Sequence, residues 1–126
     1  MLSPAGVAED RYERMLADVR AMVRERGWGA RHDPKNLAMC LASEAGELLG
    51  ELRWARNDES DEMCRDPRYR QAIVDEAADI AVSLLLFADR LGVDLCAAVH
   101  AKLAGIRAKY PASVSEQGRD GAPSGE

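Results

Sequence analysis

The sequence has few cysteines and no cysteine cluster. Three are present among 126 residues, Cys40, Cys64 and Cys96, and they lie far apart. An odd number of cysteines without a C-x-x-C pair indicates neither a disulfide framework nor a zinc site. We expect them to behave as small apolar side chains in a reducing compartment.

Long apolar runs and an excess of positive charge are also absent. No stretch approaches the roughly 18 uninterrupted apolar residues that a membrane span needs, and the N-terminal MLSPAGVAED has no apolar signal core. We therefore expect a cytoplasmic protein without a membrane partner. The 22 acidic and 17 basic side chains give a net charge of −5. This balance disfavours a nucleic acid polymer as partner, but a bound divalent cation still permits a small phosphate ligand.

No segment shows the period-two alternation of a half-buried strand, so we expect an all-α fold. The content of 47% hydrophobic and 31% charged residues fits one collapsed domain. Glycine and proline positions predict a four-helix bundle, with helices over about 7–25, 34–55, 69–91 and 94–109. The acidic segment 57–62 should be a solvated loop. Residues 1–111 then form the domain, and residues 112–126, rich in Ser, Gly and Pro, a disordered tail.

Carboxylates interrupt the apolar faces of the second and third predicted helices. Glu44 and Glu47 stand three residues apart, as do Glu76 and Asp79, so each pair projects from adjacent turns of one helix. Both pairs border the apolar stripe that should face the core. Burial of ionised carboxylates is costly unless they are paired or bound to a metal. The four acids converge if the two helices are antiparallel neighbours.

Three kinds of partner can compensate such a cluster. Ion pairs with arginine or lysine are the first, but the nearby arginines stand at predicted helix ends. A di-iron carboxylate site is the second, and it needs Glu-x-x-His pairs that neither His32 nor His100 completes. The third is an all-oxygen site for Mg²⁺ or Mn²⁺, hard cations that bind carboxylates and retain waters for phosphate. We favour this third arrangement.

A series of short motifs runs from about Arg26 to Pro111. Trp28 and His32 precede the second helix. That helix begins with Pro34-Lys35-Asn36-Leu37, contains Glu44-Ala45-Gly46-Glu47-Leu48 and ends at Trp54. Downstream follow Asp75-Glu76-Ala77-Ala78-Asp79-Ile80 and Arg107-Ala108-Lys109-Tyr110-Pro111. In order and spacing these motifs resemble the MazG-like, all-α nucleoside triphosphate pyrophosphohydrolases, in particular their small single-domain branch.

This resemblance implies an enzyme that hydrolyses a nucleoside triphosphate to a nucleoside monophosphate and pyrophosphate. It implies Mg²⁺ as cofactor and self-association as a dimer or a dimer of dimers. The substrate would be a deoxy or non-standard, dCTP-like nucleotide removed from the nucleotide pool. By the same resemblance, the catalytic metal ligands are Glu44, Glu47, Glu76 and Asp79. The substrate-binding residues are Trp28, His32, Asn36, Trp54, Lys102 and Arg107.

Two positions depart from the family pattern. Ile106 stands where the family usually has asparagine, and Ser83 stands where the dCTP-specific relatives carry tyrosine. Both departures leave the base preference open, and neither alters the predicted metal ligands. They also keep a second hypothesis open, a catalytically silent helical module that binds a nucleotide or metal without turnover. The related phosphoribosyl-ATP pyrophosphohydrolases fit the segment from Trp28 to His32 less well.

Overall fold

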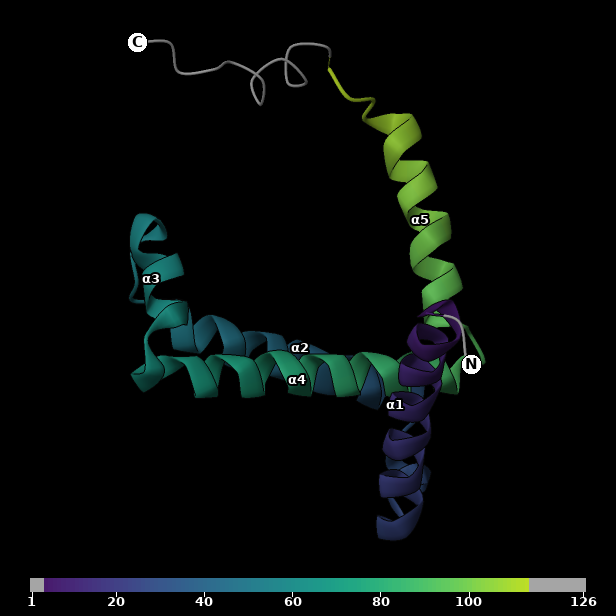
Figure 1. The fold of residues 1–126 in the computed structure, drawn as a ribbon. Coiled ribbons are helices and arrows are strands. Elements are labelled where there is room, and N and C mark those ends of the chain that lie inside the picture. Colours follow the sequence, from purple (N-terminus) through teal and green to yellow (C-terminus); the bar gives the residue numbers. More distant parts are fainter. Residues whose placement is uncertain (1–3, 114–126) are drawn as a thin grey trace. The chain divides into compact units, whose positions relative to one another are not determined.

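A computed structural model describes the backbone of residues 4–113 and the side chains of residues 11–113 (Figure 1). Within this range the regular structure consists of helices and contains no strand, which confirms the all-α class. The α-helices are α1 (Pro4–Arg26), α2 (Pro34–Leu52), α3 (Ser60–Arg65), α4 (Pro67–Arg90) and α5 (Leu95–Lys109). Two short 3₁₀ turns, η1 (Trp28–Arg31) and η2 (Asn57–Glu59), lie between them.

The helix ends follow the expected capping chemistry. Asp33 accepts a hydrogen bond from the backbone N–H of Asn36 at 2.9 Å, and Pro34 occupies the first position of α2. At the start of α5, Asp94 accepts one from the backbone N–H of Ala97 at 3.2 Å. The chain leaves α4 through Gly92, whose φ of +68° is a left-handed value that favours glycine. The bounds of the long helices therefore lie close to the predicted ones.

The prediction of a solvated loop over residues 57–62 is wrong, because this segment contains η2 and the start of α3. The Ser60 hydroxyl donates to the backbone carbonyl of Asn57 at 2.8 Å and holds the turn that begins α3. Met63 and Cys64 are half-buried on the short helix, which packs on α4. The charged residues of this segment therefore occupy the outer side of a small amphipathic helix, and the described residues form one more helix than predicted.

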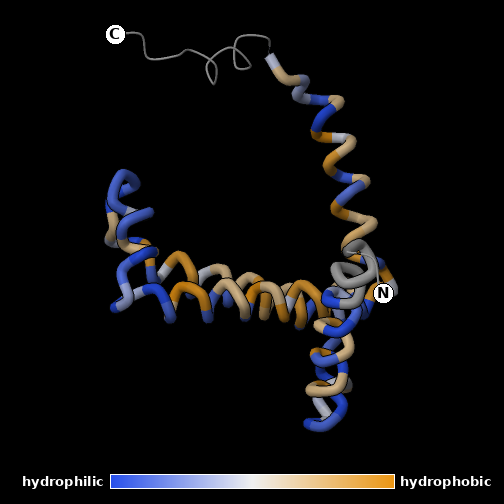
Figure 2. Tube along the Cα trace, in the orientation of Figure 1, coloured by the Kyte–Doolittle hydropathy of each residue, from blue (hydrophilic) through white to orange (hydrophobic). Residues whose placement is uncertain are grey.

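Packing in this part of the chain centres on α2 and α4, which lie side by side and run in opposite directions (Figure 1). Figure 2 shows apolar residues along both helices. α1 also contacts α4, and Arg20 Nε of α1 donates to Asp89 Oδ1 of α4 at 2.9 Å. The buried apolar side chains among the described residues are Val19, Leu37, Leu85 and Ala88. Leu41, Leu48 and Leu52 of α2 are half-buried.

The chain divides into two compact units, Met1–Val93 and Asp94–Glu126. The first contains α1 to α4, and the described part of the second contains α5. The predicted tail, residues 112–126, lies outside the described residues except for positions 112 and 113. Cys40 and Cys96 are exposed free thiols, and Cys64 is a half-buried one. Among the described helices, none is both long enough and apolar enough to cross a membrane.

Candidate metal centre

Three glutamates from two helices converge between α2 and α4. Glu44 and Glu47 come from adjacent turns of α2, and Glu76 comes from α4. Each offers one carboxylate oxygen, and these three oxygens all lie within 4.8 Å of one another. The antiparallel packing of α2 against α4 creates this cluster, which contains three of the four acids that were expected to converge. The geometry suits a single cation that binds one oxygen from each side chain.

Two of the converging carboxylates are partly buried and incompletely paired. Glu44 Oε2 and Glu76 Oε2 are inaccessible to solvent and have no hydrogen-bond partner. The ion pairs among the described residues are Arg20–Asp89, Arg26–Glu25, Arg56–Asp58 and Arg68–Asp66, and none involves the cluster. Compensation of the glutamates by arginine, the first alternative, is therefore not found in this range. A buried acceptor without a donor destabilises the fold unless a cation or a proton satisfies it.

The electrostatics of the cluster favour protons when no cation is bound. Burial raises the pKa of Glu76 to about 7, with further contributions from the neighbouring carboxylates of Glu47 and Glu44. Burial also raises the pKa of Glu44, followed in size by the effect of Glu47. A carboxyl group with a pKa near 7, as at Glu76, is partly protonated at neutral pH and exchanges its proton for a metal ion. The residues present therefore fit a divalent cation.

Asp79, the fourth predicted ligand, lies beside this group without joining it. It follows Glu76 by three residues on α4, and its side chain is exposed. No oxygen of Asp79 belongs to the group that lies within 4.8 Å. Its negative charge still contributes to the raised pKa of both Glu44 and Glu76, so it stands close to the cluster. A role as ligand remains a prediction.

Near the N-terminal end of α2, three of the predicted substrate-binding residues share a cavity of about 380 Å³. Trp28, His32 and Asn36 line it together with Arg31, Met39 and Cys40. The Asn36 amide is occupied locally, because Nδ2 donates to the Arg31 carbonyl at 3.1 Å and to Asp33 Oδ2 at 2.8 Å. Asn36 therefore holds the loop before α2 in place. We refer to this space as the Trp28 cavity.

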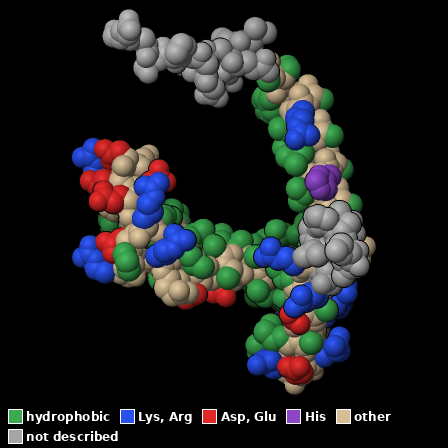
Figure 3. Space-filling view, in the orientation of Figure 1, with side chains coloured by type: hydrophobic (Ala, Val, Ile, Leu, Met, Phe, Trp, Pro, Cys, Tyr) green, Lys and Arg blue, Asp and Glu red, His purple; other side chains and the backbone are tan. Residues whose placement is uncertain are grey.

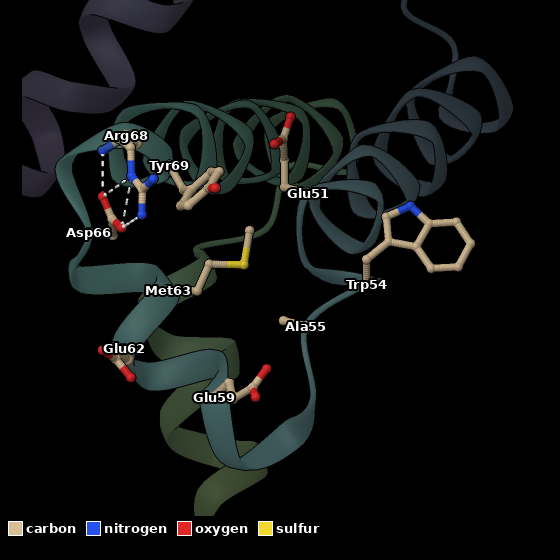
Figure 4. A pocket seen from close by; sticks show the side chains of 9 residues that line it. All are labelled: Glu51, Trp54, Ala55, Glu59, Glu62, Met63, Asp66, Arg68 and Tyr69. Carbon is tan, nitrogen blue, oxygen red and sulfur yellow. Dashed lines mark hydrogen bonds and ion pairs between the residues drawn. The ribbon is translucent and has the colours of Figure 1, made fainter.

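Trp54 lies at the other end of α2, in a separate cleft of about 610 Å³ that also involves η2, α3 and the start of α4. Figure 4 shows Met63 and Tyr69 pointing toward each other across this cleft, whereas the indole of Trp54 points away from both. The Trp54 side chain is 86% exposed, and the Arg53 guanidinium lies 5.1 Å from its ring centroid. Within one chain, the structure thus separates Trp54 from Trp28.

Two predicted substrate contacts lie on α5, and three residues that line the Trp28 cavity were not predicted. Lys102 and Arg107 are exposed on α5, in the second unit, and their predicted contact with phosphate stays a prediction. The lining residues that were not expected are Arg31, Met39 and Cys40. A helical signal for one of them was present, since Cys40 stands one turn before Glu44 on α2.

Comparison with known proteins places this arrangement in a family. No family model matches the chain. The dCTP pyrophosphatase 1 of Bos taurus is 36% identical to it over 107 residues, which cover 82% of this chain and 63% of the relative. The Homo sapiens protein of the same name is 35% identical with the same coverage. The chain therefore spans about 63% of the length of these curated relatives.

A solved structure gives the more complete match. The crystal structure of a pyrophosphatase from Archaeoglobus fulgidus aligns with a TM-score of 0.76 and 33% sequence identity. The alignment covers 81% of this chain and 94% of the archaeal chain. Because both sequence and fold agree over nearly the whole of that protein, the chain belongs to the MazG-like, all-α pyrophosphohydrolase family.

Proposed function

We propose that this chain hydrolyses a nucleoside triphosphate to a nucleoside monophosphate and pyrophosphate with the help of Mg²⁺. Water attacks the α-phosphorus, the bond to the oxygen that bridges the α- and β-phosphates breaks, and pyrophosphate leaves with the electron pair. The observation that carries this proposal is the convergence of three glutamates, two of which bury an oxygen without a partner. Buried acceptors of this kind between two helices suit a phosphate-binding metal centre.

In this proposal Glu44, Glu47 and Glu76 hold the cation, and Asp79 supplies a fourth carboxylate from the next turn of α4. When bound, Mg²⁺, or Mn²⁺ in its place, neutralises phosphate oxygens and polarises a water for in-line attack. The glutamates contribute by position: α2 and α4 fix their backbones, so that little reorganisation is needed on binding. Glu76, whose pKa is raised to about 7, also gives up the proton that it retains in part of the molecules in the absence of metal.

The Trp28 cavity is the proposed place for the nucleoside. Its indole offers a face for stacking a base, and Arg31 and His32 bring donors for a base edge or a phosphate. The cavity begins one turn before Glu44, because Cys40 lines it. The cleft at Trp54 suits the triphosphate less well, since Glu51, Glu59 and Glu62 line it. Lys102 and Arg107 are proposed as additional cations for the phosphates.

The proposed substrate is a deoxy or non-standard nucleotide similar to dCTP. This choice is supported by the names of the curated relatives, which are dCTP pyrophosphatases. Ser83, one of the two departures from the family pattern, is buried on α4. The other, Ile106, is 43% exposed on α5. Neither residue belongs to the glutamate cluster. The residues that would influence base preference are therefore different from those that would hold the metal.

The test is a product assay with a panel of nucleoside triphosphates and Mg²⁺. We expect pyrophosphate and a nucleoside monophosphate in equal amounts, with deoxycytidine nucleotides among the preferred substrates. Orthophosphate as the only phosphorus-containing leaving product, or no product with any nucleotide, contradicts the proposal.

The same assay separates an enzyme from a silent nucleotide-binding module. Glu47→Gln keeps the size of the side chain and removes one negative charge from the cluster, so turnover should fall sharply. Glu13→Gln makes the same change at an exposed site on α1 and should leave turnover intact. A module without catalytic activity would show no turnover in any of the three proteins.

A further inference from the structure

Arg31 is a cation at the Trp28 cavity whose guanidinium takes no part in holding the fold together. It ends η1 and lines the cavity together with Trp28 and His32. The ion pairs and side-chain hydrogen bonds among residues 11–113 do not involve its guanidinium. Asp33, the acid nearest in sequence, is already engaged, because its two oxygens accept from the backbone N–H and the side-chain amide of Asn36. The N–H donors of Arg31 are therefore available to a ligand.

The backbone that carries Arg31 is held in place by the start of α2. The Asn36 side-chain amide donates to the Arg31 carbonyl at 3.1 Å and to Asp33 Oδ2 at 2.8 Å. The next residue, His32, donates its backbone N–H to the Gly29 carbonyl at 3.2 Å. A backbone fixed before binding lowers the entropy lost when a side chain meets its ligand. The exposed guanidinium thus extends from a fixed point at the cavity.

Arg31 lies at the end of the Trp28 cavity that is remote from the glutamate cluster. α2 begins at Pro34, and Glu44 follows ten residues later, which is about 15 Å along the helix axis. Arg31 precedes this start, whereas Cys40, which also lines the cavity, lies one turn before Glu44. A triphosphate held at the cluster would place its phosphates beyond the Cys40 end of the cavity. The base, at the other end of the nucleotide, would then meet Arg31.

The Trp28 indole has one face covered and the other available for a base. The Arg26 guanidinium lies 5.7 Å from the ring centroid, and Arg26 is not among the residues that line the cavity. Figure 3 shows basic side chains at this end of α1, whose last turn contains Arg24 and Arg26. A base stacked on the other face of the indole turns its edge, not its ring plane, toward neighbouring side chains. Donors placed beside such an edge distinguish bases by their pattern of acceptors.

We propose that Arg31 selects the base, by donating two hydrogen bonds to an edge that carries two adjacent acceptors. Among the pyrimidines, cytosine has such an edge, formed by N3 and O2. In uracil and thymine N3 carries a proton, so that a donor of the base would face the donors of the guanidinium. Donors left without an acceptor in a cavity weaken binding. This inference rests on the proposed hydrolysis and names the feature of the base that the Trp28 cavity recognises.

The ratio of kcat/KM for dCTP to kcat/KM for dUTP tests the proposal, because these nucleotides differ only at N3 and at the substituent on C4. Arg31→Gln should lower this ratio by roughly 5- to 150-fold, since an amide offers one donor and one acceptor and can pair with either base. Arg31→Lys keeps the charge but loses the two parallel donors, so it should also lower the ratio. Lys35→Gln is the matched control. It removes the same charge from an exposed residue at this end of α2 that does not line the cavity, and it should leave the ratio unchanged.

Two kinetic results would overturn the proposal. One is a wild-type ratio close to one. The other is an equal fall in kcat/KM for both nucleotides in Arg31→Gln, which would show that Arg31 contacts a phosphate and not the base. Arg31 is exposed, and Asn36 binds only its backbone carbonyl, so we expect both Arg31 variants to keep the thermal midpoint of the wild type.

A binding measurement separates this proposal from the proposed hydrolysis. Analogues of dCTP and dUTP in which NH replaces the oxygen between the α- and β-phosphates bind without being cleaved. Equilibrium dialysis with Mg²⁺ should show tighter binding of the dCTP analogue by the wild type and loss of this preference in Arg31→Gln. That result would support the role of Arg31 even in a protein that releases no pyrophosphate. Equal dissociation constants of the two analogues in the wild type, or the same preference in Arg31→Gln, would overturn it.

Discussion

Glu44 on α2 and Glu76 on α4 each bury one carboxylate oxygen without a hydrogen-bond partner, and oxygens of the two side chains lie within 4.8 Å of each other. Two helices 15 residues apart in the sequence thus bring like charges together at their packed face. Burial of these two oxygens is unfavourable while both carboxylates are charged, and a bound proton or cation removes this cost. Protonation and metal binding at this site are therefore linked.

Addition of Mg²⁺ to the metal-free protein should release protons near neutral pH. Glu76, whose pKa is raised to about 7, retains a proton in part of the molecules, and a coordinated carboxylate must lose it. Calorimetry in two buffers with different ionisation enthalpies measures the number of protons released. The number should fall as the pH rises above about 8, where Glu76 is already ionised. Glu76→Gln should reduce the release, and an unchanged release from this variant would contradict the linkage.

Without metal, the fold should lose stability as the pH rises. A carboxyl group whose pKa is higher in the folded than in the unfolded protein stabilises the fold below its unfolded pKa. This contribution disappears as the pH rises through the folded value, here about 7 for Glu76. The thermal midpoint of the metal-free protein should therefore decline between about pH 5 and 8, and Mg²⁺ should reduce the decline. Glu76→Gln should flatten the curve, whereas Glu13→Gln should follow the wild type.

Asp79→Asn tests whether the next turn of α4 completes the metal centre. If Asp79 becomes a ligand, loss of its charge should weaken Mg²⁺ binding by roughly tenfold or more. Asp75→Asn is the control, because the exposed Asp75 carboxylate on the same helix accepts a hydrogen bond from Gln71 Nε2 at 2.8 Å. Titration calorimetry of both variants gives the comparison. Equal Mg²⁺ affinity in Asp79→Asn and the wild type would exclude Asp79 from the site.

Trp28→Ala should weaken nucleotide binding more than it slows turnover. Stacking of a base on an aromatic ring contributes about 1–3 kcal/mol, which corresponds to an increase in KM of roughly 5- to 150-fold. Trp54→Ala, in the separate cleft at the far end of α2, provides the comparison. Steady-state kinetics of both variants decide which aromatic residue meets the nucleoside. A KM that rises only in Trp54→Ala would assign the nucleoside to the cleft at Trp54.

Asp33→Ala should destabilise the fold near the start of α2. One carboxylate oxygen caps the helix through the Asn36 N–H, and the other accepts from the Asn36 side chain. Loss of such a cap costs about 0.5–2 kcal/mol of the free energy of unfolding. Urea denaturation of the metal-free protein measures the change. A smaller loss in Asp33→Asn, which retains an acceptor oxygen, would support the capping role, and equal stability of Asp33→Ala and wild type would refute it.

Much of the site could be predicted from the sequence because helical periodicity is a local property. The spacing of Glu44 and Glu47, together with Glu76 on a second apolar helix, was enough to predict their convergence. The caps at Asp33 and Asp94 were recognisable for the same reason. The spacing of residues along one helix does not show in which direction each side chain points where two helices pack together. The position of Asp79 outside the group of three oxygens was therefore not predicted.

Features that depend on tertiary contacts were harder to predict. The acidic composition of residues 57–62 favoured a loop, whereas the packing of Met63 and Cys64 stabilises a short helix there. Trp28 and Trp54 were expected around one nucleoside, but they stand at opposite ends of α2, a helix of 19 residues. Their separation follows from helix length, since each residue of an α-helix adds about 1.5 Å along its axis. Only contact between chains could bring two such residues to one ligand.

The most direct test of the central claim is pyrophosphate release from a nucleoside triphosphate by wild type and Glu47→Gln at saturating Mg²⁺. We expect rapid release of pyrophosphate by the wild type and a rate that depends on Mg²⁺. In Glu47→Gln the rate should fall by roughly two orders of magnitude or more, because even residues that merely support metal ligands contribute about 10- to 100-fold. Glu13→Gln should retain the wild-type rate. Equal rates in Glu47→Gln and the wild type would contradict the assignment of the glutamate cluster as the metal centre.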